Sequence, residues 1–170
     1  MTELCIIKLG KSNKILEESL AMEKAVFTTL CMVEDENKNV LVQERIGGNW
    51  TGIAFPGGHV ESGESFVSSV VREVFEETGY TIENPQLCGI KQFPTDDGAR
   101  YVILLFKANR FHGELQSSNE GRVFWADYEK LNEYNLAVDM LEMMPLFEDD
   151  TKSEFYYYKN ETDEWQYTIY

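Results

Sequence analysis

One segment of the sequence, Glu64 to Thr78, has a clear helical periodicity. Its apolar residues recur at spacings of three and four, as expected for one side of an amphipathic helix. They are Val67, Val70, Val71, Val74 and Phe75. Gly79 follows directly and is a typical helix stop, because glycine readily adopts the left-handed conformation that ends a helix. The fold must therefore accommodate this helix.

Runs rich in β-branched and aromatic residues lie on both sides of the helix and predict strands. The first two, Val26 to Val33 and Val40 to Gln43, are separated by the polar residues 34–39 and are expected to pair as an antiparallel hairpin. Three further strands are expected, at Leu87 to Phe93, Tyr101 to Ala108 and Gly121 to Trp125.

The C-terminal part of the chain predicts one more helix and one more hairpin. The helix is expected within Leu136 to Leu146, where Leu136, Met140, Met143 and Met144 share a side. Aromatic runs on either side of the polar sequence NETDE are typical of a terminal hairpin. Together these elements predict an α+β layered domain with a mixed sheet and two helices.

The length, 170 residues, is that of a single domain, and no repeat or Pro/Ser-rich linker divides the chain. We expect an N-terminal leader over residues 1–23, the domain itself over residues 24–150 and an aromatic extension over residues 151–170. The extension either adds an edge strand, covers the sheet or forms a dimer contact. Both a monomer and a homodimer are therefore left open.

Acidic side chains outnumber basic ones, so the net charge is 15 − 30 = −15. Binding to duplex nucleic acid or to an anionic membrane requires a basic face, and the sequence argues against both. A small phosphorylated ligand is compatible with this charge when divalent cations bridge it to carboxylates. The expected partner is thus a small molecule.

The cysteines fit neither a disulfide framework nor a zinc site, because Cys5, Cys31 and Cys88 are odd in number and widely spaced. This favours a reducing compartment. No apolar window approaches 18 residues, and the N-terminus lacks the apolar core of a secretory signal. We therefore expect a cytoplasmic protein.

Three glutamates, Glu73, Glu76 and Glu77, share one patch of the predicted helix, on the side expected to lie opposite the valines. Such a patch is either a solvated acidic face or a cation site. Like charges at these spacings near a helix C-terminus destabilise the helix by about 0.2–0.5 kcal/mol per pair. A hard cation such as Mg²⁺ or Mn²⁺ would offset this penalty and support phosphoryl transfer.

The stretch GGHVESGESFVSSVVREVFEETGY resembles the Nudix box, G-x5-E-x7-R-E-U-x-E-E-x-G-U, in which U is a bulky aliphatic residue. The matching residues are Gly58, Glu64, Arg72, Glu73, Val74, Glu76, Glu77 and Gly79, and only Tyr80, at the last position, departs from the pattern. The resemblance covers about residues 24–147 and is greatest to MutT-like proteins, which hydrolyse oxidised nucleoside triphosphates. It implies an α/β/α sandwich and metal-dependent hydrolysis of nucleoside diphosphates linked to another group.

The same resemblance implies roles for particular residues. The implied metal ligands are the carbonyl of Gly57 and the carboxylates of Glu73, Glu76, Glu77 and Glu120. The implied catalytic set is Glu73, Glu77, Arg72 and Glu120, in which Arg72 orients a carboxylate through an ion pair. Glu64 has a supporting position. The base that activates water is Glu120, Glu73 or Glu77, and the sequence leaves this choice open.

Substrate-binding residues are expected at Arg45, Phe55 and Asn135. By resemblance, Arg45 contacts a phosphate or the base, although Glu44 stands where MutT-like proteins often have a second basic residue. Asn135 either reads a purine edge or caps the helix expected after it. Phe55, with Trp50 as its neighbour, either forms a pocket wall or belongs to the core. His59 is expected to have a surface role.

These features predict a Nudix hydrolase that uses Mg²⁺ or Mn²⁺ to cleave a nucleoside triphosphate, by preference 8-oxo-dGTP, to the monophosphate and pyrophosphate. Within the family, the alternative substrates are ADP-ribose, a dinucleoside polyphosphate or an RNA 5′ end. A non-catalytic nucleotide sensor is a further alternative, but none of the acids of the box is missing, which disfavours it.

Overall fold

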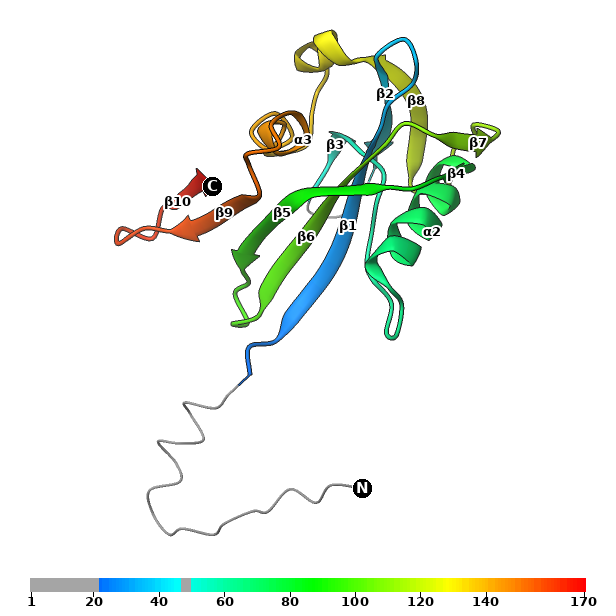
Figure 1. Ribbon diagram of the computed structural model, residues 1–170. Coiled ribbons are helices and arrows are strands. Elements are labelled where there is room, and N and C mark those ends of the chain that lie inside the picture. Colours follow the sequence, from blue (N-terminus) through cyan, green and yellow to red (C-terminus); the bar gives the residue numbers. More distant parts are fainter. Residues whose placement is uncertain (1–21, 47–49) are drawn as a thin grey trace, which may run out of the picture.

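The computed structural model describes residues 22–46 and 50–170, so the expected leader over residues 1–23 falls almost entirely outside the described residues. Within them, the largest sheet has the strand order β1-β6-β5-β9-β10 (Figure 1). These strands are β1 (Ala25–Val33), β6 (Arg100–Ala108), β5 (Gln86–Pro94), β9 (Glu154–Lys159) and β10 (Trp165–Ile169). β1 runs parallel to β6 and β9 parallel to β5, whereas β5–β6 and β9–β10 are antiparallel. The expected mixed sheet is confirmed.

A second, antiparallel sheet has the order β3-β2-β8, with β2 (Asn39–Arg45) between β3 (Gly52–Ala54) and β8 (Gly121–Asp127). Two short strands, β4 (Tyr80–Ile82) and β7 (Phe111–Gly113), form a separate pair. The helical elements are α2 (Phe66–Thr78), the 3₁₀ helix η1 (Tyr128–Glu133) and α3 (Pro145–Glu148).

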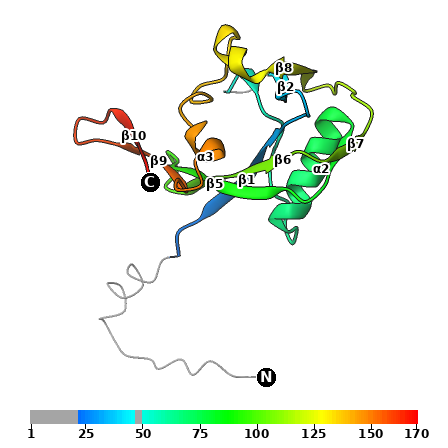
Figure 2. The same cartoon turned by 45° about the horizontal axis from the view of Figure 1, so that its top comes forward.

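The core lies on both faces of the largest sheet. Side chains alternate along β1, so Cys31 and Val33 pack with Val70 and Val74 of α2. On the other face, Leu30 and Met32 pack with Leu146 and Phe147 of α3. Figures 1 and 2 show α2 and α3 on either side of β1, β5 and β6. This layered arrangement is the expected sandwich, and Cys31 is a fully buried core residue.

The expected hairpin of the first two strands is wrong. A bridge between Glu34 and Val40 closes the turn, but β1 then pairs with β6 while β2 pairs with β3 and β8. The physical reason is burial: residues 28–33 and 40–43 are buried without alternation. Strands covered on both faces lie inside layered sheets, where non-local partners compete with the neighbour in sequence.

The helix predicted within Glu64 to Thr78 is confirmed as α2. Its N-cap is Ser65, whose hydroxyl accepts the Ser68 N–H at 3.0 Å. Its C-cap is Gly79, at φ +77°, whose N–H donates to the Phe75 carbonyl at 2.8 Å. However, the orientation differs from the expectation, because Val67 and Phe75 are exposed whereas Glu77 is buried on the same side as Val70 and Val74. The three glutamates therefore do not all lie opposite the valines.

The regular helix expected within Leu136 to Leu146 is also wrong. Most of this segment forms turns, and α3 begins at Pro145. Asp139 has φ +66°, which a right-handed helix excludes, and Pro145 has no N–H to continue a helical ladder from the preceding turn. The methionines are nevertheless buried, so the hydrophobic pattern marks core residues without fixing their secondary structure.

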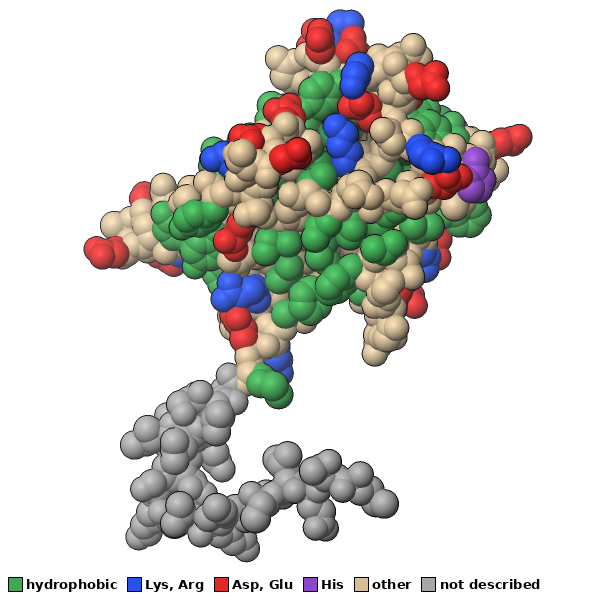
Figure 3. Space-filling view, viewed as in Figure 1, with side chains coloured by type: hydrophobic (Ala, Val, Ile, Leu, Met, Phe, Trp, Pro, Cys, Tyr) green, Lys and Arg blue, Asp and Glu red, His purple; other side chains and the backbone are tan. Residues whose placement is uncertain are grey.

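The terminal hairpin is confirmed: β9 and β10 pair from Trp165–Lys159 to Ile169–Phe155. It extends the largest sheet, because β9 pairs with β5 along Ile90–Gln92. In Figure 3 hydrophobic side chains, tyrosines among them, gather at the left end of the molecule, where Figure 1 places this hairpin. In the part of the chain that is described, no helix has the length and apolar character needed to cross a bilayer.

Candidate active site

The glycine loop before α2 runs directly against β1. Thr29 donates its N–H to the Gly58 carbonyl at 2.8 Å, so backbone meets backbone here. At Gly57, φ is +154° and a Cβ would lie 2.1 Å from the Thr29 carbonyl oxygen; at Gly58 a Cβ would lie 2.4 Å from Glu73 Oε2. Glycine is therefore required at Gly57, where the clash is with backbone, whereas a side chain at Gly58 would displace the Glu73 carboxylate; the two glycines let the loop lie against the α2 carboxylates.

Glu77 is the buried acid of the site, with 3% of its surface exposed. Its Oε2 accepts the Gly57 N–H at 2.8 Å, and Arg45 Nη1 lies 3.6 Å from Oε1. Among the described residues, Oε1 has no hydrogen-bond partner. Burial raises the pKa of Glu77 to about 8, the Gly57 and Arg45 contacts oppose this shift, and Glu120 adds to it. The only positive group near Oε1 within the described residues is Arg45, which is too distant to hydrogen-bond to it, so this buried oxygen favours a further positive partner.

Arg72 binds the other acids of the helix. Its guanidinium makes two hydrogen bonds to Glu64, both at 2.9 Å, and one each to Glu73 at 2.8 Å and Glu76 at 3.0 Å. We call Glu64, Glu73, Glu76, Glu77 and Arg72 the carboxylate cluster. The hydrogen bonds from Arg72 lower the pKa of Glu64 to about 2. For Glu73, burial outweighs Arg72 and raises the pKa, with Glu76 and Glu120 adding to the rise.

The donor chemistry of the cluster fits a divalent cation, since it consists of carboxylates that raise one another's pKa and one of which has a buried, unpaired oxygen. The carbonyl of Gly57 also accepts no hydrogen bond within the described residues. In the arrangement seen, however, no three acidic, histidine or cysteine side chains of residues 22–46 and 50–170 converge on one point. Arg72 binds only Oε1 of Glu73 and Oε2 of Glu76, so the second oxygen of each carboxylate is left for an ion, and small shifts would bring these oxygens together with Glu77.

A cavity of about 340 Å³ opens beside the glycine loop. We call it the aromatic cavity because its walls include Trp50, Phe93, Tyr101, Tyr157 and Trp165. Gly57, Gly58 and Arg45 line the end next to the carboxylate cluster, so cavity and cluster adjoin. Its size and lining are those of a small-molecule site.

The residues predicted to bind substrate do not all lie at the aromatic cavity. Arg45 lines the cavity and stacks over Trp50 at 5.8 Å, while Trp50 donates its indole N–H to the Val138 carbonyl at 2.9 Å. Phe55 is fully buried and packs edge-on against Phe147, so it has the core role that was its alternative. His59 is exposed, as expected, and also lines the cavity.

Asn135 and Glu120 lie outside the aromatic cavity. The Asn135 carbonyl accepts the Ile53 N–H at 2.8 Å and its side chain is exposed. It caps no helix, since turns follow it, so that alternative is wrong. Glu120 precedes β8 in an exposed loop, where the Ile46 N–H contacts its carbonyl at 3.4 Å, and it acts electrostatically on Glu73 and Glu77.

Sequence reasoning missed several residues that line the cavity, among them Lys91, Asp139, Tyr157 and Trp165. One signal was available, because Lys91 is the only charged residue between Gln86 and Pro94. The aromatic runs of the C-terminal extension are visible in the sequence, but the sequence left open which surface they contact. Only the β5–β9 pairing brings them to the cavity.

Comparison with known proteins agrees with this geometry. The family model described as "NUDIX domain" matches residues 24–147. The uncharacterized Nudix hydrolase YvcI of Bacillus subtilis is 36% identical over 114 residues, which are 64% of this chain and 70% of that protein. The crystal structure of a MutT protein from Bacillus halodurans superposes with a TM-score of 0.69 at 29% identity, covering 85% of this chain and 97% of that one.

Relatives with named substrates differ from one another. An ADP-ribose pyrophosphatase of Methanocaldococcus jannaschii is 33% identical over 92 residues, 54% of either chain. An oxidized purine nucleoside triphosphate hydrolase of Danio rerio is 28% identical over 122 residues, 69% of this chain and 76% of that protein. The hydrolase class is common to both, whereas the substrate is not.

Proposed function

Because this chain belongs to the Nudix family of hydrolases, we propose that it cleaves a nucleoside triphosphate, preferentially 8-oxo-dGTP, to the monophosphate and pyrophosphate. The observation that carries the proposal is the position of Glu77. It lies buried, with one oxygen that accepts no hydrogen bond from the described residues, where the carboxylate cluster meets a cavity large enough for a base. A triphosphate bound with its base in the cavity would extend along Gly57 and Gly58 towards the acids.

The residues that would hold Mg²⁺ or Mn²⁺ are Glu73, Glu76, Glu77 and Glu120 with the Gly57 carbonyl. Such an ion, when bound, supplies a more acidic water and neutralises charge on the phosphates. Arg72 fixes the carboxylates of Glu64 and Glu73 in place through its hydrogen bonds. Arg45, between Glu77 and the cavity, presents a positive charge where the phosphates would pass. A water attacks phosphorus, and Glu120, Glu73 or Glu77 accepts its proton.

ADP-ribose is the second candidate substrate, favoured by the identity to the Methanocaldococcus enzyme. Both substrates contain a pyrophosphate bond and a base, but they differ in the group beyond the phosphates. The partner in either case is a nucleotide. A reducing, cytoplasmic setting is part of the same proposal.

The test is a substrate panel of 8-oxo-dGTP, dGTP, ADP-ribose and diadenosine tetraphosphate, hydrolysed in H₂¹⁸O with Mg²⁺. We expect 8-oxo-dGTP to have the highest kcat/KM and the products to be the monophosphate and pyrophosphate, with the label showing which phosphorus is attacked. Release of the diphosphate and inorganic phosphate, or a higher kcat/KM for ADP-ribose, contradicts the proposal. Omission of the metal is the control.

A further inference from the structure

An ion pair lies inside the aromatic cavity. Lys91 Nζ donates to Asp139 Oδ2 at 2.7 Å, and the two side chains are 6% and 16% exposed. The ammonium also lies 5.2 Å from the ring centre of Phe155 and 5.7 Å from that of Tyr157. Lys91 is thus held by one carboxylate and two aromatic rings of the C-terminal extension, at a wall that is otherwise largely apolar.

Stability does not explain this pair. Removing two charges from water has a desolvation penalty that their attraction seldom exceeds, so an apolar pair of the same size would be about as stable. A buried ion pair without a net gain in stability, inside a ligand cavity, is better explained by recognition.

The free hydrogen-bonding groups of the pair have a definite order. Lys91 has three donors, of which Asp139 takes one, and Asp139 Oδ1 accepts no hydrogen bond within the described residues. Reading across from Nζ through Oδ2 to Oδ1 gives one donor followed by two acceptors. The Watson–Crick edge of guanine has the complementary order: the O6 acceptor, the N1–H donor and the N2–H₂ donor.

We propose that Lys91 and Asp139 select guanine by binding this edge. In the same register hypoxanthine satisfies two of the three groups, because it lacks only the N2–H₂ donor. Adenine and cytosine each place an amino donor against the ammonium and a ring acceptor against Oδ2. The inference rests on the proposed function and names the base-reading residues of that site, for which Asn135 had been the expected one. Oxidation at C8 leaves the Watson–Crick edge unchanged, so the pair reads guanine and 8-oxoguanine alike.

The test compares dGTP, dITP and dATP as substrates of the wild type, the single variants Lys91→Met and Asp139→Asn, and the double variant Lys91→Met/Asp139→Leu. A single substitution leaves one buried charge without its partner and can prevent folding. The double variant removes both charges, so the inference can still be tested if the single variants do not fold. A bidentate base contact is worth about tenfold to a hundredfold in discrimination. We therefore expect a wild-type preference for dGTP over dATP of at least about tenfold, with dITP between them, and in the variants a ratio of the two kcat/KM values that falls towards one.

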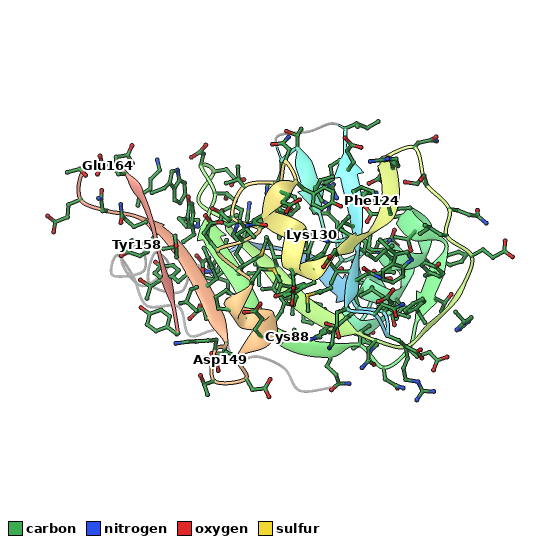
Figure 4. The ribbon with its side chains drawn as sticks, turned by 90° about the horizontal axis from the view of Figure 1, so that it is seen from above. Cys88, Phe124, Lys130, Asp149, Tyr158 and Glu164 are labelled. Carbon is green, nitrogen blue, oxygen red and sulfur yellow. The ribbon has the colours of Figure 1, made fainter. Side chains whose placement is uncertain are left out.

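Lys130→Met is the matched control, because Lys130 pairs with Asp127 at the same 2.7 Å but on the surface, in η1, outside the cavity (labelled in Figure 4). A second readout needs no metal and no turnover: calorimetric binding of dGMP and dAMP. If the double variant retains the wild-type preference in both assays, the inference is wrong.

The proposed hydrolysis and the inference can fail separately. Equal hydrolysis of dGTP, dITP and dATP by the wild type supports the activity and overturns the base reading. No hydrolysis of any triphosphate, combined with dGMP binding at least about tenfold tighter than dAMP and dependent on Lys91, overturns the triphosphate substrate and supports the base reading. Equal binding of dGMP and dAMP overturns the inference whatever the activity.

Discussion

The carboxylate cluster and the aromatic cavity adjoin, but they are built from the sequence in different ways. Every residue of the cluster lies between Glu64 and Glu77. The cavity combines residues of β1, β2, β5 and β6 with Trp50, the glycine loop, Asp139 and the C-terminal hairpin. The comparison teaches that most groups proposed to act on phosphate come from one helix and its N-terminal loop, with Glu120 and Arg45 as the exceptions, whereas the groups proposed to hold the base depend on long-range pairing.

The largest effect is expected for Glu77→Gln. Glutamine can still accept the Gly57 N–H but provides no charge for a cation, so turnover should fall by at least about a thousandfold. Removing a buried charge should leave the thermal midpoint unchanged or higher. Rates and calorimetric melting check both parts, with exposed Glu133→Gln as the control. A variant with near-normal turnover would mean that the cluster is not the reacting centre.

Arg72→Met is expected to lower kcat by about a hundredfold, because Glu64, Glu73 and Glu76 lose the group that orients them. The Arg72–Glu64 ion pair also makes the stability of the folded state depend on pH. Arg72 lowers the folded-state pKa of Glu64 to about 2, so its stabilisation is complete above the ordinary carboxyl pKa and is lost as the pH falls through about 2. A carboxyl-carbon NMR titration of the variant should return the Glu64 pKa towards 4.5. An unshifted Glu64 titration would rule out this role for Arg72.

On the cavity side, Trp165→Ala should raise KM about tenfold at unchanged kcat, because loss of a stacking surface weakens ground and transition states equally. Tyr158→Ala is the matched control: it lies on the same hairpin but alternates to the opposite face, where it stacks on Tyr156. Equal KM values for the two variants would exclude the hairpin as a wall of the substrate site.

The smallest effect is expected for Asn135→Ala. Its side chain is exposed outside the cavity, and its structural contact with Ile53 uses the main chain. An exposed substitution of this kind changes free energies by less than about 0.5 kcal/mol, or about twofold in kcat/KM. A loss of guanine preference as large as that of the Lys91 variants would show that Asn135 takes part in recognising the base.

The sequence predicted the local features of the carboxylate cluster better than it predicted the aromatic cavity. The helix, its Ser65 and Gly79 caps and the proximity of its glutamates are local properties, set by spacing and by glycine conformation. The inward position of Glu77 was not predictable from spacing, because apolar periodicity assigns acids to the outer face. Its burial depends on the Gly57 N–H, supplied by a loop twenty residues away.

Apart from the terminal hairpin, local sequence patterns did not predict which strands pair with each other in the sheets. The run around Leu30 looks the same whether its neighbour is β2 or β6, and the choice is made by burial on both faces. Likewise, the methionine spacing before Pro145 predicted a helix because it could not reveal the positive φ of Asp139. The Lys91–Asp139 pair, 48 residues apart, results from both of these features.

The hairpin meets the rest of the largest sheet along one short parallel seam, Ile90–Gln92 against Glu154–Tyr156, and Lys91 sits in the middle of it. Exchanging the terminal 20 residues could therefore retune which nucleotide is chosen without touching α2 or its glycine loop. In this arrangement the residues that contact the base and those that act on the phosphates can be replaced independently of each other. The hairpin and the rest of the sheet share three paired positions.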